Sequence, residues 1–286
     1  MREVGLLFVL PVLLVGCTFD AEKETDEYDE EQVGEVAGAL STDNALTPNA
    51  LTPNALTPNA LTPNALTPNA LTPNALAPSA LSSLENNGAA GEISRQLFKY
   101  VVSCALDDSQ SFTLSWDDAG GAPQTVTYWG SLGLAPAWAT RGLNLPEQKW
   151  VSACLGARTN YTGASVTISV RGTHGLATAD SDERASFGVQ EGAFWGNLFD
   201  SNPWMRACES SLNVTYSREH QRECAAGHWD VTTSSTLSCG IITRVGSCAS
   251  ACVGRTVPSS APPVTDPESG FEACQGTAEV LTAYLR

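Results

Sequence analysis

The sequence predicts an α+β fold, in which a single disulfide-bridged globular domain at residues 85–286 follows a disordered, proline-containing repeat stalk. Helix and strand patterns in this domain occupy separate stretches and do not alternate strictly, which favours α+β over a parallel sheet. The domain holds eight of the nine cysteines, an even number that can pair completely. At about 200 residues it is long enough for one substantial core.

The first 16 residues have the pattern of a signal peptide. The apolar run from Val4 to Val15 is too short to span a bilayer and fits the hydrophobic region of an export signal. It ends in Leu-Val-Gly-Cys17, which resembles the lipobox of bacterial lipoproteins. By that resemblance the mature chain begins at Cys17, which carries the lipid. By the same resemblance, Thr18 rather than Asp after the cysteine favours sorting to the outer membrane. The alternative is an ordinary signal peptide that happens to contain a cysteine.

Residues 17–43 form an acidic linker behind the lipid anchor. Between Thr18 and Asp43 there are ten acidic residues and one basic residue, Lys23. Such a segment stays solvated and extended. The whole chain has a net charge of −16, so it repels phosphate and we expect no nucleic acid partner.

Residues 44–84 repeat a pentapeptide. Asn-Ala-Leu-Thr-Pro occurs six times from Asn44 to Pro73, and two altered units follow. A proline at the end of each of the first seven units prevents continuous helix and central strand, so we predict an extended, polyproline-like stalk. The alternative is a pentapeptide-repeat solenoid, but eight units are too few to bury a core.

The globular domain contains two predicted helices and several predicted strands. An apolar stripe favours a helix over residues 91–105, and Pro146 opens a second helix that carries Trp150, Cys154 and Ala157. Residues 111–116 and 125–129 alternate around a Gly-rich loop, which predicts a β-hairpin. Residues 166–170 also alternate, and weaker patterns favour strands at 212–216 and 237–245.

Eight cysteines remain for disulfides once Cys17 is assigned to lipid: Cys104, Cys154, Cys208, Cys224, Cys239, Cys248, Cys252 and Cys274. The two predicted helices each carry one inward cysteine, which favours a Cys104–Cys154 disulfide. The other six then pair among themselves, in an order that the sequence leaves open.

The combination of lipobox, acidic segment, pentapeptide tract and cysteine-rich domain resembles uncharacterised bacterial surface lipoproteins of social, gliding bacteria. The resemblance extends into the domain at residues 99–104, 150–154 and 190–194. It implies a location and an architecture, and no activity.

Two stretches have residues that could bind metal. His220, Cys224 and His228 are spaced by four, with Glu219 or Glu223 as a possible fourth zinc ligand. The even cysteine count disfavours this, because a ligating Cys224 would leave one thiol unpaired. Asp180, Asp182 and Glu183 could offer calcium ligands, but without EF-hand spacing a solvated turn is favoured. We therefore predict no metal and no cofactor.

No motif for nucleophilic catalysis occurs, and an enzyme is not favoured. The chain lacks Gly-x-Ser-x-Gly, Ser-x-x-Lys and His-Glu-x-x-His. Paired carboxylates drawn from Glu183, Glu191 and Glu209 keep open an alternative function, that of an anchored hydrolase of cell-wall or capsule polymer.

All seven tryptophans lie in the globular domain. Trp138, Trp195 and Trp204 have Gly- and Pro-rich neighbours, which predicts exposed ligand-binding rings. The alternative is that they pack in the core, as we expect for Trp150.

Together these patterns predict a lipid-anchored protein of the cell envelope, in the outer membrane with its domain extracytoplasmic. The domain is expected to bind a ligand or to form part of the coat. The expected partners are the membrane, through the anchor, and either polysaccharide or another surface protein.

Overall fold

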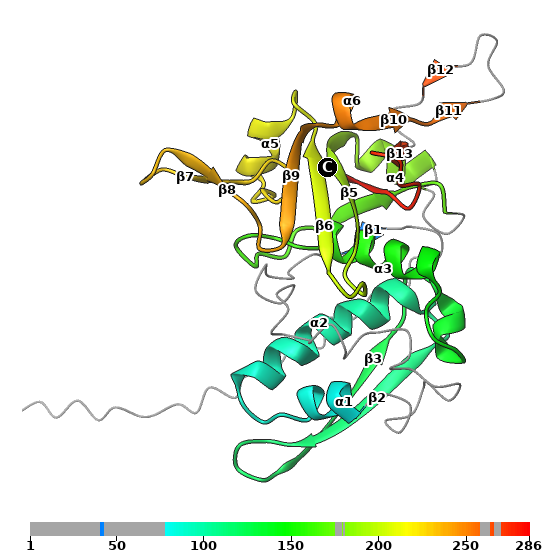
Figure 1. Ribbon diagram of the computed structural model, residues 1–286, viewed down its shortest axis with the longest axis vertical. Coiled ribbons are helices and arrows are strands. Elements are labelled where there is room, and N and C mark those ends of the chain that lie inside the picture. The colour runs from blue at the N-terminus through cyan, green and yellow to red at the C-terminus, as the bar shows by residue number, and fades with distance from the viewer. Residues whose placement is uncertain (1–40, 43–77, 175–178, 180, 258–263, 266–269) are drawn as a thin grey trace, which may run out of the picture. The chain divides into compact units, whose positions relative to one another are not determined.

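The computed structural model describes residues 41–42, 78–174, 179, 181–257, 264–265 and 270–286 (Figure 1). The chain divides into two units, residues 1–37 and 38–286, and every described residue belongs to the second. The predicted signal peptide, Cys17, nearly all of the acidic linker and most of the repeat tract lie outside the described residues. Within the described part, no helix combines the length and apolar character needed to cross a membrane.

The domain is built on a mixed six-stranded sheet with the order β1-β4-β14-β5-β6-β9. Its strands are β1 (Ser41–Thr42), β4 (Ile168–Arg171), β5 (Val189–Asn197), β6 (Trp204–Glu209), β9 (Ile242–Ser247) and β14 (Leu281–Leu285). All neighbours pair antiparallel except β6 and β9, which are parallel. The helices and strands confirm the α+β fold class (Figure 1).

Strand β5 lies inside the sheet, between β14 and β6, and both of its faces are buried. Phe194 packs into one hydrophobic cluster, whereas Ala193 and Trp195 pack into a second cluster on the opposite face. The strand has no room for a side chain at Gly192, where an added Cβ would lie 2.2 Å from the carbonyl oxygen of Cys208. A strand buried on both faces does not alternate in hydrophobicity, which is why the sequence did not indicate it.

The first cluster joins two helices, a hairpin and one face of the sheet. Helix α2 (Ala89–Ala105) packs against α3 (Leu145–Ala157) and against β3 (Pro123–Trp129), whose hairpin partner is β2 (Ser111–Asp117). The ring of Phe98 lies 4.9 Å from that of Phe112 and 6.3 Å from that of Trp138. Both predicted helices and the predicted hairpin are therefore confirmed, as is the strand near Ile168.

Helix α3 starts with a capping box. The side chain of Asn144 accepts a hydrogen bond from the backbone of Glu147, and the Glu147 carboxylate accepts one from the backbone of Asn144. Burial opposes ionisation of Glu147, but Arg141 donates to both of its oxygens, and the net effect lowers the pKa of Glu147. Pro146 lies in the first turn, as predicted.

Short elements complete the domain. They are α1 (Pro78–Leu84), a 3₁₀ helix (Pro136–Ala139), α4 (Ser181–Ser186), α5 (Val214–Glu219), α6 (Cys248–Ala251) and the paired strands β7 (His228–Asp230) with β8 (Ser235–Leu237), β10 (Cys252–Gly254) with β13 (Phe271–Cys274), and β11 (Thr256–Val257) with β12 (Val264–Thr265).

All eight cysteines of the domain are in disulfides: Cys104–Cys154, Cys208–Cys248, Cys224–Cys239 and Cys252–Cys274. The Cys104–Cys154 pairing between the two helices is confirmed, and the other six cysteines pair among themselves as predicted. Cys208, Cys248 and Cys274 belong to the second cluster, so this smaller core is partly built of cystine.

Two predicted strands and one predicted domain boundary differ from the structure. Residues 212–216, expected as a strand, are instead the end of a turn and the first three residues of α5; Leu212 is exposed, and no strand pairs with this segment in the described structure. The expected strand at 237–245 is interrupted where Cys239 bonds Cys224. The end of the stalk belongs to the domain, since α1 is helical and Leu84 is buried in the first cluster.

Candidate functional site

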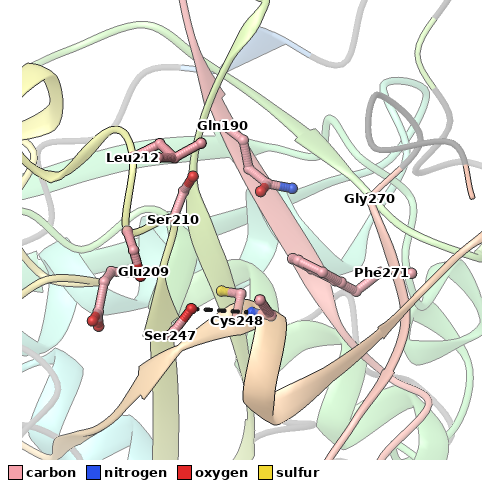
Figure 2. Close-up of a pocket in the computed structure, with 11 residues that line it drawn as sticks. Gln190, Glu209, Ser210, Leu212, Ser247, Cys248, Gly270 and Phe271 are labelled. Atoms are coloured by element: carbon pink, nitrogen blue, oxygen red, sulfur yellow. Dashed lines mark hydrogen bonds between the residues drawn. The ribbon is translucent and has the colours of Figure 1, made fainter.

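A pocket of about 270 Å³ lies beside the second cluster. It forms where β5, the end of β6, the start of α6 and the β10–β13 pair meet (Figure 2). Its lining consists of Gln190, Glu209, Ser210, Ser211, Leu212, Ser247, Cys248, Ala249, Gly254, Gly270 and Phe271. These residues come from four segments that are distant in the sequence, so no local motif could have indicated the pocket.

A β-bulge places Gln190 in this pocket. Tyr284 of β14 pairs with Gln190 while the preceding Ala283 pairs with Gly192, so Glu191 is an extra residue in β5. The Gln190 amide lies in the pocket (Figure 2). Its Nε2 donates a hydrogen bond to the hydroxyl of Tyr284 at 3.3 Å. The bulge thus directs Gln190 to the pocket, whereas Glu191 forms an ion pair with the buried Arg222.

The pocket offers hydroxyls, one amide and apolar surface. In the view of Figure 2, Leu212 and Ser210 lie to one side of Gln190, and Phe271 lies to the other. Leu212 is almost fully exposed at 97% and Phe271 is half-buried. Ser247 accepts a hydrogen bond from the backbone of Ala249 at 3.3 Å, which caps α6.

No basic side chain belongs to the described lining of the pocket. Its single charged residue is Glu209, whose side chain points away from Gln190 and Phe271 (Figure 2). The Oε2 atom of Glu209 is buried and accepts no hydrogen bond from the residues that the structure describes. The side chains directed into the pocket are therefore uncharged, and they suit a neutral ligand better than an anion.

Cys248 forms one wall of the pocket and connects it to a cluster of sulfur atoms. The Sγ atoms of Cys208, Cys248 and Cys252 lie within 4.8 Å of one another. They belong to two different disulfides, and the closest approach between these is 3.5 Å, from Cys208 Sγ to Cys252 Sγ. Because all three are oxidised, they supply no thiolate to a metal in this state.

Two of the three predicted ligand-binding tryptophans are buried, so the prediction for them is wrong. Trp138 is 3% exposed and packs on Phe98, while Trp195 is fully buried in the second cluster. Trp204 is half-buried, 5.4 Å from the guanidinium of Arg206, and does not line the pocket. Trp150 is buried, as predicted.

The possible zinc set of His220, Cys224 and His228, which the even cysteine count disfavoured, is not assembled. Cys224 is bonded to Cys239, and a disulfide sulfur is not a zinc ligand. His228 instead pairs through Nδ1 with Glu223 and stacks on Tyr161, whereas His220 stacks on Tyr216.

The predicted solvated turn at residues 180–183 is also corrected. Ser181–Ser186 is helix α4, and Glu183 is 4% exposed while Asp182 remains in solvent. Asp180 lies outside the described residues.

The paired carboxylates expected of a hydrolase are largely inaccessible. Glu191 is buried and its Oε2 is 2.8 Å from Nη2 of Arg222, which also donates to the backbone. Burial raises the pKa of Glu191, and the neighbouring Arg222 opposes that rise. With Glu183 buried as well, two of the three candidate carboxylates cannot flank a polymer bond.

We compared the chain with known proteins. No family model, no curated protein and no solved structure matches it.

Proposed function

We propose that this chain is a lipid-anchored protein of the cell envelope, in the outer membrane, whose extracytoplasmic domain binds a ligand in the pocket beside Cys248. One observation carries the proposal: the eight cysteines from Cys104 to Cys274 pair with one another, which leaves Cys17 as the one cysteine outside the disulfides of the domain. Four disulfides favour an oxidising compartment, and a cysteine directly after an apolar export signal is suited to lipid attachment.

The chemistry of the pocket supports a neutral, polyhydroxylated ligand. The lining of the pocket provides hydroxyl groups from Ser210 and Ser247 and an amide group from Gln190, and these can form hydrogen bonds with a ligand. The ring of Phe271 can pack against the apolar face of a sugar. Uncharged inward-facing side chains give no attraction for a phosphorylated or acidic glycan. A neutral segment of cell-wall or capsule polysaccharide therefore fits this pocket best, and the acidic linker and repeat tract would give the domain reach toward it.

Metabolic labelling tests the anchor. Cells expressing the full chain are fed radiolabelled palmitate, and the wild type is compared with Cys17→Ala. We expect label on the wild type and none on the variant, because the acyl chains are attached through Cys17. Equal labelling of both proteins, or none on either, would contradict the anchor.

A binding measurement tests the pocket. The full chain, solubilised in detergent, is titrated with neutral and with acidic fractions of the envelope polysaccharide. We expect the neutral fraction to bind, and Phe271→Ala to weaken binding about tenfold, equivalent to about 1.4 kcal/mol. Leu212→Ser at the rim should weaken it less, since Leu212 is largely in solvent.

Val253→Ser is the matched control, because Val253 is exposed on the adjacent strand β10 and does not line the pocket. It should bind as the wild type does. If neither fraction binds, or if the control loses as much affinity as Phe271→Ala, the pocket is not the binding site and a purely structural role in the coat is favoured.

A further inference from the structure

Two disulfides of the second cluster are in contact with each other. Cys208–Cys248 and Cys252–Cys274 approach to 3.5 Å between Cys208 Sγ and Cys252 Sγ. This is a van der Waals contact between sulfurs that are not bonded to each other. Among the described residues no other group of three cysteines gathers in this way.

The two disulfides differ in their exposure. Cys208 and Cys274 are fully buried and Cys248 is 2% exposed, whereas Cys252 is half-buried. Cys252 is therefore the most exposed residue of the four, and we expect an external thiol to reach it first. Exchange between a thiol and a disulfide requires access and a thiolate close to the sulfur that it attacks. Cys252 meets the condition of access, because it is only half-buried. A thiolate at Cys252 would meet the condition of proximity, because its sulfur lies 3.5 Å from Cys208 Sγ.

We infer that these four cysteines form a thiol–disulfide exchange site, in which an external dithiol reductant converts the two disulfides into a single different one. One thiolate of the reductant attacks Cys252, the Cys252–Cys274 bond breaks, and Cys274 leaves and is protonated. The second thiol of the reductant then displaces Cys252 as a thiolate. The reductant becomes a disulfide, two electrons and one proton have passed to the protein, and the second proton of the reductant goes to solvent.

The second stage takes place within the protein and needs no further reductant. The Cys252 thiolate attacks Cys208 Sγ across the 3.5 Å contact, a Cys208–Cys252 bond forms, and the Cys208–Cys248 bond breaks. Cys248 leaves as a thiolate and takes up a proton. The product holds one disulfide, Cys208–Cys252, and two thiols, at Cys248 and Cys274.

The short helix α6 makes this rearrangement possible without loss of the fold. Cys248 begins α6 and Cys252 directly follows it, so β6 stays cross-linked to the same segment before and after exchange. Backbone pairing of β6 with β9, from Met205 with Ile242 to Glu209 with Ser247, also joins the two strands. The change therefore concentrates at Cys248, which lines the pocket beside Ser247 (Figure 2). Exchange places a free thiol in the pocket wall.

Peptide mapping of the full chain tests this inference. The protein is treated with one equivalent of dithiothreitol, quenched with acid, labelled with N-ethylmaleimide and digested without reduction. We expect a new cross-linked peptide pair containing Cys208 and Cys252, with label on Cys248 and Cys274. Label on Cys252 and Cys274, with Cys208–Cys248 intact, would overturn the inference.

Two matched variants separate exchange from simple reduction. Cys274→Ser leaves Cys252 as a thiol without any reductant, and label should then appear on both Cys252 and Cys248. Cys252→Ser leaves Cys274 as the free thiol and removes the attacking sulfur, so Cys248 should stay unlabelled. We expect at least about tenfold more label on Cys248 in the first variant than in the second.

Intact Cys104–Cys154 and Cys224–Cys239 peptides report that each variant has folded. If Cys274→Ser fails this check, the dithiothreitol experiment on the wild type decides alone. Equal labelling of Cys248 in two folded variants would overturn the exchange, and would do so whether or not the pocket binds polysaccharide.

Discussion

Replacing Arg222 with methionine should destabilise the domain by about 3–5 kcal/mol, because it leaves the Glu191 carboxylate buried without its counter-charge. The two side chains are 0% and 1% exposed, and Arg222 Nη2 lies 2.8 Å from Glu191 Oε2. Arg222 also donates to the carbonyl oxygens of Ala157 and Thr159, at 2.6 and 2.9 Å. The substitution therefore also leaves two carbonyls at the end of α3 without a donor.

Thermal and urea unfolding, followed by tryptophan fluorescence without reductant, measure the effect. For a domain of this size the loss corresponds to a melting temperature lowered by roughly 6–20 °C. The double variant Glu191→Leu with Arg222→Met removes both charges, and it should recover a large part of the loss. A loss below about 1 kcal/mol for Arg222→Met, or a double variant whose loss equals the sum of the two single ones, would refute the reasoning.

The effect should depend on pH in a defined direction. Burial raises the pKa of Glu191 above the ordinary value of 4.5, and removing Arg222 removes the attraction that opposes this rise. The folded state then binds the proton more tightly than the unfolded state, so stability falls as the pH rises above 4.5. The difference between Arg222→Met and the wild type should be smallest below pH 4.5 and should grow toward neutral pH.

Three further predictions test the packing of the domain. Gly192→Ala should lower the free energy of unfolding, measured in urea, by roughly 1–3 kcal/mol, because its Cβ would meet the backbone of Cys208; Gly188→Ala, where a Cβ meets nothing within 4 Å, is the control and should be nearly neutral. Burial raises the pKa of Tyr128 to about 12, so stability should fall as the pH rises above 10, and Tyr128→Phe should abolish this slope in alkaline unfolding. Asn144→Ala removes the cap of α3 and should cost about 1 kcal/mol in guanidinium unfolding.

The elements that could be predicted are those with a local signal. The apolar stripe over residues 91–105, the alternating hairpin strands and Pro146 each act within a few residues, and the structure has an element at each place. By contrast, β5 and β14 are buried along nearly their whole length, so they lack the alternation by which a half-exposed strand is found. Residues 212–216 show the reverse case, because they were expected as a strand and are the end of a turn and the start of helix α5.

The tryptophans show why exposure could not be predicted. Gly and Pro neighbours favour a surface position for Trp195, but the side chain points to the face of β5 that packs against Cys208 and Val280. The two rings that are most exposed, Trp129 and Trp229, lie on the hairpin strands β3 and β7, and the sequence did not single out either ring as exposed. Burial is decided by what packs over a residue, which is a property of distant segments.

The sequence by itself determined the cysteine content and the charge of this protein: an even set of eight cysteines within one domain, a ninth directly after an apolar run, and a net charge of −16. These follow from composition and order along the chain. Only the tertiary structure decided which sulfurs lie in contact and which uncharged side chains line the pocket. The physical reason is that both depend on the pairing of β5, β6 and β9 and on one bulge at Glu191, and no short window of sequence specifies them.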